Sequence, residues 1–172
     1  MTSSGPYEYP QVVEGWKNMS LAIEKILTPA TGHPAHTGID EAERGLNISV
    51  VFTSVEATLE ALKEAGTLAS SLGAKITLLV PQVVPYPLPL ETPPVLVDFN
   101  ERRFQVIAGL SPVETRVQVY LCRDKLETLT TALSPGSIVV LGGRRRWWPT
   151  HDEVLARALR RAGYEVIFKE TE

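Results

Sequence analysis

The stretch that decides the fold is "ISVVFTSVEATLEALKEAGTLASSLGAKITLLV", residues 48–80. Its first six residues form a short β-branched run, which is typical of a buried parallel strand. Thr53-Ser-Val-Glu56 has the spacing of a helix-capping box, and a helix should follow. Gly73 favours the end of that helix, and 75–80 is expected to be the next strand. The apolar face of the helix should contain Leu59, Leu62, Leu68 and Leu72.

The rest of the chain repeats this alternation. Further strands are expected over 116–121, 137–142 and 164–169, and helices should begin near Asp98, Asp124 and Thr150. Strands that alternate with helices predict an α/β fold over 47–172, with a doubly wound, flavodoxin-like sheet of five parallel strands and helices on both faces. The inward side chains of these helices should be Val106, Ile107 and Leu110; Leu126, Leu129 and Leu133; and Val154, Leu155, Ala158, Leu159 and Ala162.

Two segments do not follow the alternation. Residues 81–94 hold six prolines, so they can form neither a helix interior nor a central strand. Residues 1–46 should be an N-terminal extension, with one short amphipathic helix over 12–27 and a flexible linker over 28–38. His33 and His36 lie in that linker without further ligands nearby, so no metal site is expected.

The composition excludes several classes of protein. The chain has 172 residues, 44% of them apolar, and a formal net charge of −3, which does not suggest a protein that binds nucleic acid. No apolar run reaches the roughly 18 residues of a membrane span, and the N-terminus does not resemble a signal peptide. The single cysteine, Cys122, fits a reducing compartment, so we expect a cytoplasmic protein. We expect no catalytic residue, because Cys122 has no activating histidine and His151 lies inside a cap sequence.

Residues 48–84 and 138–169 resemble the two ends of a universal stress protein. The resemblance includes the Leu72-Gly73-Ala74 step that ends the first helix and the Thr77-Leu78-Leu79 core of the following strand. It implies the five-stranded fold over 47–172 and a role in stress response. Because the strand at 164–169 should be an edge of the sheet, it also implies a homodimer formed through that strand.

The resemblance is incomplete where members of the family that bind ATP carry their signatures. Those members have an aspartate at the end of the first strand, where this chain has Thr53. They also have glycine-x-x-glycine, nine residues and then glycine-serine or glycine-threonine after the fourth strand. Here Gly142 matches the first glycine, but Arg145 takes the second place and His151-Asp152 stands near the last. The departures imply that ordinary ATP binding is lost.

Ligands of doubly wound sheets bind beyond the carboxyl ends of the strands. Here these ends lead into the stretch "LGGRRRWWPTHDE", residues 141–153, which leaves three interpretations open. The arginines are solvated and the tryptophans pack over the sheet end; or arginine side chains bind an anion; or the stretch is a contact surface for a partner, a membrane or nucleic acid. Residues 142–163 carry a charge of +4 and residues 1–47 one of −3, so the N-terminal arm is one candidate contact. The candidate ligand-binding residues are Thr53, Ser54, Val80, Gly142, Gly143, Arg144, Arg145 and Arg146.

Two functions remain open from the sequence. The first is a non-enzymatic regulatory domain of the stress response that acts through homodimerisation or a protein partner. The second is a module of the same superfamily, possibly enzymatic, that binds ATP, AMP or another anionic ligand.

Overall fold

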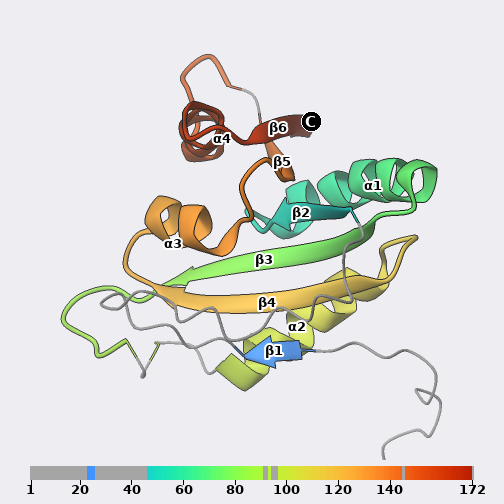
Figure 1. Cartoon of the computed structure of the whole chain (residues 1–172). Coiled ribbons are helices and arrows are strands. Elements are labelled where there is room, and N and C mark those ends of the chain that lie inside the picture. Colours follow the sequence, from blue (N-terminus) through green and yellow to red (C-terminus); the bar gives the residue numbers. More distant parts are fainter. Residues whose placement is uncertain (1–22, 26–45, 91–92, 94–96, 145, 172) are drawn as a thin grey trace, which may run out of the picture.

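The computed structural model describes residues 23–25, 46–90, 93, 97–144 and 146–171 (Figure 1). Strands and helices alternate along the chain as the sequence predicts. The strands are β1 (Ile23–Lys25), β2 (Asn47–Val51), β3 (Lys75–Val83), β4 (Thr115–Cys122), β5 (Ile138–Arg144) and β6 (Glu165–Thr171). The helices are α1 (Val55–Leu72), α2 (Val97–Gly109), α3 (Lys125–Ala132) and α4 (His151–Arg161).

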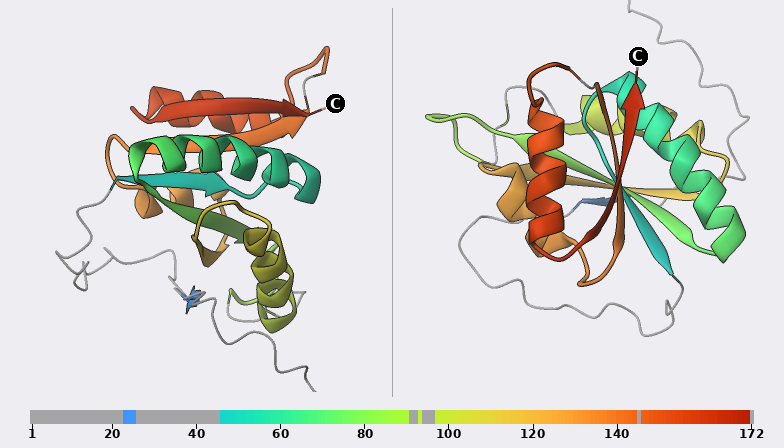
Figure 2. Two further views of the ribbon diagram at one scale, coloured as in Figure 1. Left: turned by 90° about the vertical axis from the view of Figure 1, so that its right-hand side faces the viewer. Right: turned by 90° about the horizontal axis from the view of Figure 1, so that it is seen from above.

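All strand pairs are parallel, in the order β1-β4-β3-β2-β5-β6. The five predicted strands are confirmed, and the three-residue β1 adds a sixth beside β4. Helices α1 and α2 cover one face of the sheet, around Leu62 and Ile107, while α3 and α4 cover the other, around Leu129 and Leu159 (Figure 2). Strand β6 lies at an edge, as predicted.

Strand β1 corrects one prediction in the N-terminal extension. The helix expected over 12–27 is wrong at Ile23–Lys25, because these residues pair with β4 in the register Ile23 to Val117. An edge of the sheet can recruit a short extended segment through its backbone alone, whatever the periodicity of that segment. The remainder of 12–27, the linker over 28–38 and both of its histidines lie outside the described residues, and the domain boundary at residue 46 stays a prediction.

The start and end of α1 follow the sequence closely, with one shift. The N-cap is Ser54, whose Oγ accepts from the Ala57 backbone N–H at 3.3 Å, so the capping box expected at Thr53 is wrong by one residue. Gly73 ends the helix in the left-handed conformation, with φ of 63°, as predicted. Asp124 likewise caps α3 by accepting from the Glu127 N–H at 2.8 Å.

Several apolar side chains that were expected in the core are exposed. The face of α1 that packs on the sheet is built largely from alanines, whose small side chains let a helix approach the strands closely. The exposed side chains among those expected in the core are Leu72, Val106, Leu110, Val154 and, at the end of α4, Ala162, whereas Ala57, Ala61, Ala65, Phe104 and Ala156 are buried.

Strand β3 extends past the predicted end at Val80 and includes Pro81. Strand β2 pairs with β3 only as far as Leu79, so beyond that residue β3 has a single partner, β4. A proline is tolerated there because β3 has no second neighbouring strand to which residue 81 would have to donate an N–H. Within the described residues, no helix is both long and apolar enough to cross a membrane.

Candidate functional site

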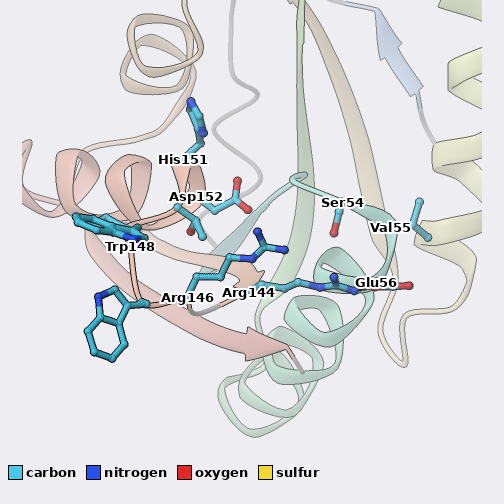
Figure 3. Close-up of a pocket in the computed structure, with 11 residues that line it drawn as sticks. Ser54, Val55, Glu56, Arg144, Arg146, Trp148, His151 and Asp152 are labelled. Atoms are coloured by element: carbon cyan, nitrogen blue, oxygen red, sulfur yellow. Dashed lines mark hydrogen bonds and ion pairs between the residues drawn. The ribbon is translucent and has the colours of Figure 1, made fainter.

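An open cleft of about 1010 Å³ lies beyond the carboxyl ends of β2 and β5. One wall is the start of α1, and the other is residues 146–150, which we call the tryptophan loop, with the start of α4 (Figure 3). This is the position that the sequence predicts for a ligand. The lining residues are Ser54, Val55, Glu56, Arg144, Arg146, Trp147, Trp148, Pro149, Thr150, His151 and Asp152.

The two glycines do not form a loop at this cleft. Gly142 and Gly143 are buried within β5, in register with Lys169 and Glu170 of β6, so the strand continues past its predicted end at Gly142 as far as Arg144. A Cβ at Gly142 would lie 1.8 Å from the Ala57 carbonyl oxygen, so only glycine lets β5 pack this closely against the first turn of α1. We therefore assign these glycines to packing.

Thr53 and Ser54 use their side chains to join elements of the fold. Strand β2 pairs with β5 only as far as Leu141, and beyond it the Thr53 hydroxyl donates to the Gly142 carbonyl at 2.7 Å. The Thr53 side chain thus bonds to β5 where the backbone pairing of β2 has ended. Ser54 caps α1 and also lines the cleft. Val80 is buried, 2% exposed, and does not line the cleft.

Carboxylates occupy the first turns of both helices that begin at the cleft. Glu56 lies in the first turn of α1, and Asp152 and Glu153 lie in that of α4. Thr150 and Glu153 form the predicted capping box. Burial raises the pKa of Asp152, against the smaller lowering effects of Lys125 and His151. These carboxylates already complement the helix dipoles and would repel a phosphate placed there.

The arginines are only partly available to a ligand. The Arg144 guanidinium contacts the Glu56 carboxylate at 3.0 Å, and both side chains are more than half exposed. Such an exposed pair is worth about 0–1 kcal/mol, so a competing anion could displace it. Within the described part of the chain, Arg146 has no ion pair, and Arg145 itself is outside that part.

The tryptophans do not pack over the end of the sheet. Trp147 is 94% exposed and Trp148 is 77% exposed, so the interpretation that placed both rings on the sheet is wrong. Figure 3 shows the Trp148 ring on the side of the loop that faces away from Arg144 and Glu56.

Other reactive side chains in the described residues do not form a site. Cys122 is buried, and burial raises the pKa of its thiol, in part offset by a hydrogen bond with Thr128 and by Lys125. A thiol of raised pKa is a poor nucleophile at neutral pH. No group of three or more histidine, cysteine, aspartate or glutamate side chains that could hold a metal ion occurs in the part of the chain that the structure covers.

The comparison with solved structures agrees with this architecture. A protein of the universal stress protein family from Burkholderia pseudomallei matches 73% of this chain and 96% of its own, with 24% identity and a TM-score of 0.51. No protein-family model and no curated protein sequence matches the chain. The fold is that of the universal stress proteins, as the resemblance at residues 48–84 and 138–169 implies.

Proposed function

We propose that this chain is a non-enzymatic regulatory domain of the cytoplasmic stress response, acting through homodimerisation or a protein partner and not through ordinary ATP binding. The proposal that the chain does not bind ATP in the ordinary way rests on the position of Gly142 and Gly143. A phosphate loop presents backbone N–H groups on small, accessible residues. Here the corresponding glycines are buried between α1, α4 and β6.

The helix starts support the same proposal. A phosphate bound at the strand ends would meet Glu56 at α1 and Asp152 at α4. The family likeness supports the stress-response role through the fold alone.

One observation favours the alternative, a module that binds ATP, AMP or another anion. The cleft is large enough for a nucleotide, and Arg144 and Arg146 both line it. Arginine side chains would then replace the backbone donors of a phosphate loop. Such a ligand would have to displace Glu56 from Arg144.

A thermal-shift screen with ATP, AMP, cyclic nucleotides and phosphate separates the two proposals. A ligand present at 100 times its dissociation constant adds about 2.7 kcal/mol to the unfolding free energy, which is readily detected. We expect no shift with any of these compounds. A shift with ATP or AMP that Arg146→Ala abolishes would replace the first proposal with the second.

The dimer is tested separately. Strand β6 is an edge with backbone groups that can pair with a second copy. We expect sedimentation of the full chain at micromolar concentration to give a dimer. A wild-type monomer would contradict homodimerisation.

A further inference from the structure

The tryptophan loop exposes two large apolar side chains side by side. In Figures 1 and 2 the chain between β5 and α4 stands out from the body of the domain. No ring contact involves Trp147 or Trp148 in the described residues. Tryptophan contributes a large apolar surface together with one N–H donor, so an exposed pair at a loop tip is suited to a surface that is apolar on one side and wet on the other.

Positive charge surrounds the two rings. Arg146 immediately precedes them and has no ion pair within the described residues. Arg144 lies 3.0 Å from the exposed Glu56, and Arg157 lies 3.7 Å from Glu153, whose side chain is only 14% exposed. Residues 142–163 together carry a charge of +4, although the whole chain has a net charge of −3.

The nearby carboxylates lie behind the loop. Figure 3 shows the Asp152 carboxylate on the cleft side, towards Arg144 and Arg146, and Glu56 on the far wall of the cleft. Glu153 is held in the capping box with Thr150. A surface that approaches the loop tip would therefore meet the tryptophan rings before it meets any of these acids, while Arg144 and Arg146 point into the cleft (Figure 3).

We infer that the tryptophan loop binds an anionic lipid surface, with Trp147 and Trp148 in the headgroup region and Arg146, the residue directly before them, turning from the cleft to contact lipid phosphates. Tryptophan is enriched at membrane interfaces, and the arginine fork matches phosphate oxygens. A projecting loop can enter a deformable lipid surface, whereas a protein partner would have to supply a pocket for each ring. The inference goes beyond the proposed function and does not depend on whether ATP binds.

Tryptophan fluorescence of the full chain can report this binding directly. The chain has three tryptophans, and Trp16→Phe leaves only the two in the loop. The variant is mixed with vesicles of phosphatidylcholine alone and with vesicles of equal parts phosphatidylcholine and phosphatidylglycerol. We expect a blue shift and co-sedimentation with the anionic vesicles only, and weaker binding as salt is raised. Absence of binding to the anionic vesicles at low salt would overturn the inference.

Three variants assign the binding to the loop. In co-sedimentation, Trp147→Ala/Trp148→Ala should raise the lipid concentration for half binding by about tenfold or more, and Arg146→Gln should raise it less. Leu72→Ala removes an exposed apolar side chain at the opposite end of α1 and should change nothing. Thermal melts followed by circular dichroism check that each variant is folded. If the double variant does not fold, the comparison of Arg146→Gln with the wild type still tests the inference. Equal lipid binding by the wild type and the folded loop variants would overturn the inference. A wild type that binds no lipid, together with a double variant that has lost the dimer, would overturn it as well.

Discussion

Replacement of Gly142 by alanine tests whether this glycine serves packing. Its Cβ would lie 1.8 Å from the oxygen, 2.5 Å from the carbonyl carbon and 3.0 Å from the Cα of Ala57. These are backbone atoms in the first turn of α1, so relief requires the helix to move away from β5. Overpacking of a core costs about 1–3 kcal/mol, and a backbone clash places Gly142→Ala at about 3 kcal/mol or more.

The chain supplies two comparisons for this substitution. A Cβ at Gly143 would meet the Phe168 ring at 2.7 Å and Asp152 Cβ at 3.0 Å, and the ring can turn aside, so Gly143→Ala should cost about 1–2 kcal/mol. A Cβ at Gly109 meets nothing within 4 Å, and Gly109→Ala should be neutral or slightly stabilising.

Denaturant unfolding followed by circular dichroism measures the change in unfolding free energy for all three variants. We expect the order Gly142 greater than Gly143 greater than Gly109, with a fall in melting temperature of roughly 10 °C for Gly142→Ala. If Gly142→Ala is as stable as Gly109→Ala, then β5 and α1 are not in close contact and the packing role is refuted.

Three further substitutions test the contacts around the cleft by thermal and denaturant unfolding. Thr53→Val removes the donor to the Gly142 carbonyl and should cost about 1–2 kcal/mol; a neutral result would exclude that hydrogen bond. Thr150→Ala removes the cap of α4 and should cost about 1 kcal/mol, and an unchanged midpoint would contradict the capping box. The pKa of Asp152 is raised in the folded chain, so stability falls as pH rises from about 4 through that pKa. Asp152→Asn should remove this fall and be the more stable protein at neutral pH, whereas parallel pH profiles would refute the raised pKa.

The fold follows from sequence because its signals are local and agree with one another. β-branched runs, cap residues such as Asp124 and Thr150, and the left-handed Gly73 each depend on neighbouring residues alone. Parallel pairing and helices on both faces then follow from the alternation. The short strand β1 could not be found this way, because it is defined by its pairing with β4 and not by its own pattern.

The site was harder to predict because its glycines are ambiguous in sequence. A glycine after an apolar run fits a loop that holds phosphate and equally fits a strand pressed against a helix. Only the contact of Gly142 with Ala57, 85 residues earlier in the chain, separates the two. The exposure of Trp147 and Trp148 likewise could not be predicted from the apolar pattern, in which two adjacent tryptophans are typical of packing residues.

The claim that the strand-end glycines do not receive a phosphate is tested most directly by their own amide signals. A titration of the ¹⁵N-labelled chain with ATP can be followed at Gly142 and Gly143 and, for comparison, at Gly73 and Gly163 in the helix ends away from the cleft. We predict that the Gly142 and Gly143 signals stay unmoved at millimolar ATP. Saturable movement of these two signals, with Gly73 and Gly163 unchanged, would contradict the account.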